Sequence, residues 1–80
     1  MDAKKKPISL SACLAHNLRT IRESRNLSQS ALARLAEVGQ PSISDIESGA
    51  RGASFAMIAT LGKALNVDPR ELLREPKDAA

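Results

Sequence analysis

Apolar residues recur along this 80-residue chain at the spacing of α-helices. Four aliphatic side chains near the start follow one another at intervals of four, four and three, which places them on one helical face: Leu10, Leu14, Leu18 and Ile21. A second apolar series has intervals of three, three and four: Phe55, Ile58, Leu61 and Leu65. No segment shows the strict apolar–polar alternation of a half-buried strand. The pattern predicts an all-α fold.

Residues that favour helix ends divide the chain into five predicted helices. Residues suited to the N-cap precede the helices, and in chain order they are Ser9 or Ser11, Ser28, Gly39, Ser54 and Asp68. Residues suited to ending a helix follow three of them: Asn26, Gly49 and Asn66. Proline, which is tolerated in a first turn, stands near two starts: Pro41 and Pro69. We therefore expect a flexible basic arm over residues 1–9, a helical domain over 10–74 and a short tail over 75–80.

The predicted core is aliphatic, because the chain has one Phe and neither Trp nor Tyr. A domain this small buries a marginal core, so each aliphatic side chain matters. The core positions that we expect are Leu14, Leu18, Ile21, Leu32, Ala33, Val38, Ile43, Ile46, Ile58, Leu61, Leu65 and Leu72. Either Leu35 or Ala36 completes the inward face of the second helix.

Residues 28–49 have the spacing of a helix-turn-helix unit. Gln29 opens a short helix, Ala33 lies four residues later, where two helices cross closely, and Val38 falls in the turn. Ile43 and Ile46 are three apart, on the inward face of a second helix.

The opposite face of that second helix carries Gln40, Ser44 and Asp45. A helix that buries one face and presents short hydrogen-bonding side chains on the other can enter a DNA major groove.

The distribution of charge favours a polyphosphate partner near the N-terminal end. The formal net charge is +3, and residues 3–36 carry seven Lys and Arg against Glu23 alone. Residues 52–80 carry four basic and four acidic residues. A mildly basic surface without a partner fits the charge equally well, so charge alone does not decide.

The sequence resembles a known family over residues 18–73. The segments LRTIRESRNLSQSALA, VGQPSISDIESG and IATLGKALNVDPRELL follow one another in the order found in lambda-repressor-like domains, the phage repressor/Cro-type or XRE family. The resemblance implies a compact five-helix fold and a sequence-specific transcriptional regulator. We expect a repressor that binds a palindromic operator as a homodimer, with the helix around residues 40–48 in the major groove of double-stranded DNA.

The resemblance also implies roles for individual residues. Base contacts are expected from Gln40, Pro41, Ser44 and Asp45. Phosphate contacts are expected from Gln29, Ser42, Arg51, Lys4, Lys5, Lys6 and Arg19. In relatives the residue at Gln29 also braces a side chain on the reading helix, and Arg22 and Glu47 align with a structural ion pair. Gln40 is suited to adenine, with which glutamine pairs through two hydrogen bonds.

Two residues depart from the family pattern. Glu37 stands where the turn usually has glycine, and a left-handed non-glycine residue costs about 1 kcal/mol. We therefore expect either a distorted turn or one without a positive φ. Asp45 is acidic on a face that meets phosphates, so it either accepts from a cytosine amino group or points away from DNA.

A dimer surface is expected at the start of the fifth helix. Four apolar residues there exceed what one short helix buries inward: Val67, Pro69, Leu72 and Leu73. Since one reading helix covers few base pairs, two-fold pairing would supply the missing specificity.

Other classes of function are less well supported. The alternative is an antitoxin or partner-binding autoregulator of a toxin–antitoxin pair. Catalysis is not expected, because the chain has a single His and a single Cys and no cluster of carboxylates. Cys13 and His16 alone cannot form a metal site, and no cofactor is expected. The lone thiol and the lack of a signal peptide or long apolar run favour the cytoplasm.

Overall fold

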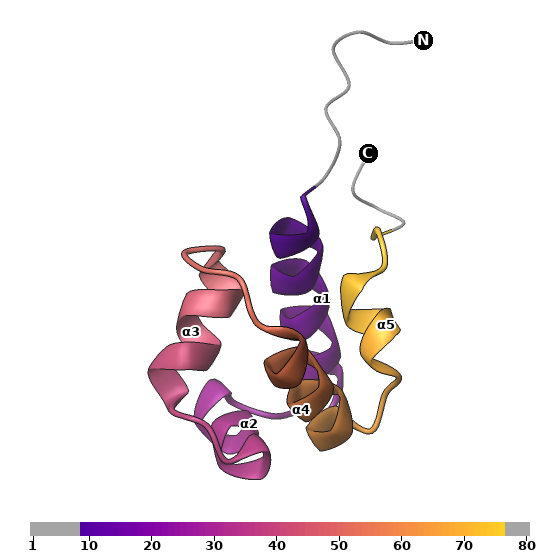
Figure 1. Ribbon diagram of the computed structural model, residues 1–80. Coiled ribbons are helices and arrows are strands. Elements are labelled where there is room, and N and C mark those ends of the chain that lie inside the picture. The colour runs from indigo at the N-terminus through magenta and orange to yellow at the C-terminus, as the bar shows by residue number, and fades with distance from the viewer. Residues whose placement is uncertain (1–8, 77–80) are drawn as a thin grey trace, which may run out of the picture.

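The computed structural model describes residues 9–76, which form five helices (Figure 1). In chain order the helices are α1 (Leu10–Ser24), α2 (Gln29–Ala36), α3 (Gln40–Ser48), α4 (Phe55–Leu65) and α5 (Pro69–Leu73). The described residues contain no strand, which confirms the prediction of an all-α, five-helix domain. The predicted lysine arm lies outside the described residues, as does most of the tail.

The long helix α1 lies between the other helices (Figure 1). It packs against α3 on one side and α5 on the other, while α2 packs against both α3 and α4. Helix α4 completes the bundle through its contact with α5. This arrangement leaves one long face of α3 uncovered.

A side-chain oxygen caps the N-terminus of four of the five helices. Ser9, Ser28 and Ser54 each accept the N–H of the residue three positions later, at 3.0, 3.0 and 3.1 Å. Asp68 accepts the N–H two positions later at 2.9 Å. Helix α3 begins at Gly39, which has no side chain to cap it. The caps therefore fall where the sequence placed them, with Ser9 as the first.

The turn between α2 and α3 keeps its left-handed geometry without glycine. Glu37 has φ 59° and ψ 43°, and the Val38 N–H donates to the Ala33 carbonyl at 2.9 Å. Both expectations for Glu37 were therefore wrong, since the turn is regular and φ is positive. Glu37 is exposed, and a left-handed non-glycine residue costs about 1 kcal/mol, which the turn tolerates.

Ten of the twelve predicted core residues are buried, and Ile21 and Val38 are partly buried against them. Cys13 and Ala36 join the buried set, and Ala36 rather than Leu35 faces inward. Three apolar side chains from the helical patterns are exposed instead: Leu10 at 66%, Leu35 at 58% and Phe55 at 88%. Leu10 and Phe55 are the first residues of their helices, where no neighbouring helix reaches over them.

Two close contacts that the sequence analysis did not predict hold α5 in place. The Asn17 side chain of α1 donates to the carbonyls of Leu72 and Arg74, at 3.0 and 2.7 Å, where α5 ends. At Gly62 of α4, an added Cβ would lie 3.0 Å from the Val67 carbonyl oxygen and 3.2 Å from Pro69. Glycine therefore allows the chain to turn tightly from α4 into α5.

Replacing Ala33 with leucine should destabilise the domain, because Ala33 is 4% exposed where α2 meets α3. We expect a loss of about 1–3 kcal/mol from overpacking, measured as thermal unfolding. Ala59→Leu is the matched control, since Ala59 is exposed on α4. Equal melting temperatures for Ala33→Leu and the wild type would contradict the close packing.

Candidate nucleic-acid interface

Helices α2 and α3 form one rigid unit through their buried faces. Leu32, Ala33, Ile43 and Ile46 are at most 4% exposed and belong to the core. The turn between the helices is closed by backbone hydrogen bonds from Glu37 and Val38. The core therefore determines which side chains of α3 face outward.

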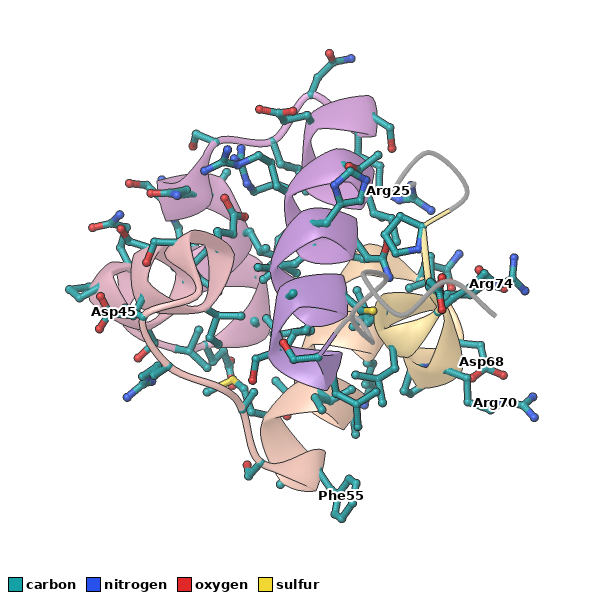
Figure 2. All side chains as sticks on the ribbon, turned by 90° about the horizontal axis from the view of Figure 1, so that it is seen from above. Arg25, Asp45, Phe55, Asp68, Arg70 and Arg74 are labelled. Atoms are coloured by element: carbon teal, nitrogen blue, oxygen red, sulfur yellow. The ribbon has the colours of Figure 1, made fainter. Side chains whose placement is uncertain are left out.

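The outward face of α3 carries the residues that the sequence analysis assigned to base contacts. Pro41 and Asp45 are exposed, while Gln40, Ser42 and Ser44 are half-buried. Figure 2 shows Asp45 on the outer side of α3, on the opposite side of the molecule from α5. This face presents amide, hydroxyl and carboxylate groups and no apolar side chain larger than proline.

Arg22 and Glu47 form a buried ion pair between α1 and α3. Arg22 Nε and Nη2 donate to Glu47 Oε2 and Oε1, at 2.7 and 3.0 Å. Arg22 Nη1 also donates to the Leu27 carbonyl at 2.6 Å. The Glu47 side chain is 0% exposed and that of Arg22 10%. The two-point contact fixes the plane of the carboxylate.

The environment of Glu47 keeps this carboxyl ionised. Burial acts to raise the pKa of Glu47, but hydrogen bonds from Arg22 and Gln29, with the charges of Arg22 and Arg19, hold the pKa below its ordinary value of 4.5. The pKa of Arg22 is raised, mainly by its hydrogen bond to Glu47. Both partners are therefore charged at neutral pH.

A chain of hydrogen bonds continues from this pair to the outer face of α3. Gln29 Nε2 donates to Glu47 Oε1 at 3.1 Å, and Gln40 Nε2 donates to Gln29 Oε1 at 2.9 Å. The first residue of α2 thus connects the buried carboxylate with the first residue of α3. We call Arg22, Glu47, Gln29 and Gln40 the polar relay.

Two arginines assigned to phosphate contacts lie beside this unit. Arg19 is 55% exposed in its side chain, and its Nε lies 3.7 Å from Glu47 Oε1. Arg51 is exposed in the segment after α3, where its backbone N–H donates to the Asp45 carbonyl at 3.4 Å. Lys4, Lys5 and Lys6, the other basic candidates, lie outside the described residues.

The predicted dimer residues do not form one apolar surface. Leu72 is 0% exposed in the core, so the prediction was wrong for this side chain, which has no surface to offer a partner. Val67 and Leu73 are half-buried and pack against the core, and Pro69 is exposed. The apolar excess that suggested an interface is largely absorbed by α1 and α4.

A different apolar surface lies at the junction of α1, α4 and α5. Leu10, Phe55 and Leu73 line a shallow hollow together with Ala53 and Ile58. Phe55 projects away from the body of the molecule at the start of α4 (Figure 2). Helical periodicity could not reveal this surface, because it groups Leu10 and Phe55 with the apolar series of their helices without showing where the neighbouring helices end.

The part of the chain that the structure describes has few groups suited to thiol chemistry or metal binding. Cys13 is buried, and residues 9–76 contain no group of three or more metal-ligating side chains. None of the described helices combines the length and apolar character needed to span a membrane.

Comparisons with known proteins agree on one kind of domain. The helix-turn-helix domain family matches residues 14–75. The restriction-modification controller protein C.AhdI from Aeromonas hydrophila is 34% identical, with a TM-score of 0.75, over 78% of this chain and 94% of that protein. A search of curated protein sequences found no significant match.

Two further solved structures are similar. A hypothetical transcription factor, NHTF from Neisseria, is 28% identical with a TM-score of 0.84, over 98% of this chain and 92% of that one. The clp gene regulator ClgR from Corynebacterium glutamicum is 25% identical with a TM-score of 0.76, over 85% and 87%.

Acid should destabilise the domain through Glu47. Because the folded-state pKa of Glu47 is lowered, the pair contributes stability above about pH 4.5, and this is lost as pH falls through the folded-state pKa. We expect the melting temperature to fall below pH 4.5. Glu47→Gln should cost about 1–3 kcal/mol at pH 7 and make the acid decline shallower.

The fall in melting temperature with acid should not vanish in Glu47→Gln, because a second carboxyl is also protonated there. Hydrogen bonds from the Arg70 side chain and backbone lower the pKa of Asp68 to about 2. Glu23→Gln is the matched control, because the Glu23 side chain is 63% exposed and lies 3.9 Å from Arg22. If Glu23→Gln changed the pH profile as much as Glu47→Gln, the buried pair would not be its source.

Proposed function

This chain belongs to the helix-turn-helix DNA-binding domains of XRE-type transcription regulators, and we propose that it is a repressor that binds an inverted-repeat operator as a homodimer. The observation that carries the proposal is the outer face of α3. The core holds this helix rigidly, and the polar relay orients its first side chain. The protein would act by occupying DNA rather than by catalysis.

We assign base recognition to Gln40, Pro41, Ser44 and Asp45. Amide and hydroxyl groups on one face of a helix can read base edges in the major groove, where each base pair has its own donor and acceptor pattern. Asp45 is exposed on this face, so its carboxylate is available to accept from a cytosine amino group. The small side chains at positions 41 and 44 allow α3 to approach the bases closely.

Phosphate contacts would come from the rim of this face. Gly39 leaves the N-terminus of α3 without a side-chain cap. Pro41 has no N–H and the Ser42 N–H donates to the Gly39 carbonyl at 3.0 Å, so we assign the phosphate contact there to the half-buried Ser42 hydroxyl. Gln29, Arg19 and Arg51 border the same face, and Lys4, Lys5 and Lys6 would add charge from the predicted arm. These contacts supply affinity rather than sequence preference.

A dimer is proposed because one reading helix recognises too few base pairs to select a genomic site. Two-fold pairing places two copies of α3 in successive major grooves about 34 Å apart. For the interface we propose the hollow of Leu10, Phe55 and Leu73 in place of Leu72. Phe55 is the most exposed large apolar side chain among the described residues, and aromatic residues are enriched in interfaces.

Selection of duplexes from a random pool by the whole chain tests the function. We expect an enriched inverted repeat with half-site centres 10–11 base pairs apart, bound about a thousandfold or more tighter than unrelated DNA. Enrichment of no sequence, with equal binding of all duplexes, would overturn the proposal.

Deleting residues 1–6 should weaken binding to all duplexes about equally, because Lys4, Lys5 and Lys6 would contact phosphates. The slope of log binding constant against log salt should become shallower by up to about 2.7 per protomer, at about 0.9 for each lost contact. Replacing the three lysines with glutamine keeps the length and serves as the matched comparison. An unchanged slope in both variants would show that the arm does not contact DNA.

Phe55→Glu should abolish the dimer while leaving the monomer folded, since this side chain is 88% exposed. Light scattering should show a monomer, and affinity for the selected inverted repeat should fall at least tenfold. Leu35→Glu is the matched control, because Leu35 is 58% exposed on α2. Dimerisation of Phe55→Glu at wild-type concentrations would rule out this surface.

A further inference from the structure

We infer that Glu47 is a positioning residue for base recognition. It fixes the amide orientation of Gln29 and Gln40, so that the Gln40 amide can form two hydrogen bonds with adenine but not with guanine. This inference rests on the proposed function and deepens it. It assigns to the buried ion pair a part in sequence specificity as well as in stability. Glu47 itself contacts no base, since its side chain is 0% exposed.

The relay begins at a group that can only accept hydrogen bonds. An ionised carboxylate has no donor, so every group that hydrogen-bonds to Glu47 must present an N–H or O–H. Its oxygens receive two N–H groups of Arg22 and the Nε2 of Gln29. Arg22 is held in turn by the Leu27 carbonyl, so the carboxylate cannot rotate away.

Gln29 carries this constraint outward. A glutamine amide has a donating NH₂ end and an accepting oxygen end, and directing one end fixes the other. Because the NH₂ of Gln29 must face Glu47, its oxygen is left for Gln40, 2.9 Å from the Gln40 Nε2. Gln40 must therefore also present its NH₂ inward, since two carbonyl oxygens cannot hydrogen-bond to each other.

The orientation of Gln40 determines what remains for a base. One N–H of its NH₂ group is used by Gln29, which leaves one N–H and the carbonyl oxygen Oε1. Adenine offers one acceptor, N7, and one donor, the N6 amino group, to the major groove. The two groups that Gln40 retains match this pair.

Guanine does not match, because it presents two acceptors, N7 and O6. A glutamine that is free to rotate could direct both N–H groups toward them. In the polar relay one of those N–H groups is already bonded to Gln29, and the Gln40 oxygen would face guanine O6 without a donor. The buried carboxylate of Glu47 thus disfavours guanine through Gln29 and Gln40, without contacting the base.

The test measures adenine-over-guanine preference with the whole chain. Selection from random duplexes gives the wild-type site, and Gln40→Ala identifies the base pair that Gln40 reads. Affinities for duplexes with adenine or guanine there are then compared in Glu47→Gln, whose amide can donate as well as accept. In Gln29→Met the relay is interrupted but the ion pair is intact, which covers the case in which Glu47→Gln does not fold.

Leu65→Ala is the matched control. It destabilises the domain from the core side of α4, where Leu65 is 1% exposed, and leaves every member of the polar relay in place. We expect a wild-type preference on the order of tenfold or more for adenine, a fall to about twofold or less in Glu47→Gln and Gln29→Met, and a preserved preference in Leu65→Ala. A purely structural role would instead make the preference follow the melting temperature in all three variants.

Three results would overturn the inference: no adenine preference that depends on Gln40, wild-type preference in a folded Glu47→Gln or in Gln29→Met, or loss of preference in Leu65→Ala. A second measurement needs no DNA. In the free protein, the side-chain amide protons of Gln29 and Gln40 should exchange slowly with solvent. Exchange should be at least fivefold faster in Glu47→Gln but not in Leu65→Ala. Unchanged exchange would also overturn the relay. A chain that selects no sequence but shows this exchange pattern would instead contradict the proposed function.

Discussion

A buried carboxylate joins three helices at the centre of this domain. Glu47 of α3 receives hydrogen bonds from Arg22 of α1 and Gln29 of α2, and it lies 3.7 Å from Arg19. A buried charge is costly unless it is paired and hydrogen-bonded, and here the hydrogen bonds and neighbouring charges keep Glu47 ionised despite burial. The position of α3 relative to α1 therefore depends on an arrangement that tolerates little displacement.

The aliphatic core and the polar relay have different tasks. Side chains such as Leu18, Leu32 and Ile43 are fully buried, but apolar packing without direction permits small rotations of a helix. Hydrogen bonds have direction, so the relay from Glu47 to Gln40 specifies the rotation of α3 about its axis. In this way a domain whose buried core is entirely aliphatic apart from Cys13 gains a defined orientation of α3.

Two outward surfaces follow from the packing around α1. The α3 face is polar, and the hollow beside Phe55 is apolar, at the junction of α1, α4 and α5. Because the two surfaces are built from different elements, a second copy could occupy one while DNA occupies the other. This separation is what a dimeric DNA-binding regulator requires, and it supports the proposed function.

Local rules and helical periodicity were enough to predict the five helices and most of the core. Local rules suffice for caps such as Ser28 and Asp68 and for the left-handed residue Gly49, because these interactions span at most a few residues. Helical periodicity also identified Leu14, Ile46 and Leu61 as buried. The family resemblance indicated the ion pair of Arg22 and Glu47. It also indicated that Gln29 braces a side chain of the reading helix and that Gln40 contacts a base.

Which apolar residues are buried depends on contacts between helices that lie far apart in the sequence. Periodicity gives the side of a helix but not where the neighbouring helix ends, so it did not show that Leu10 and Phe55, which belong to the apolar series of their helices, are exposed. Leu72 was expected both in the core and at a partner surface, and it lies in the core, in a helix that Asn17 of α1 holds through the Leu72 carbonyl. The polar relay could also not be predicted from local sequence, because its members lie up to 25 positions apart. The direction of each of its hydrogen bonds follows from the buried carboxylate of Glu47, which can only accept.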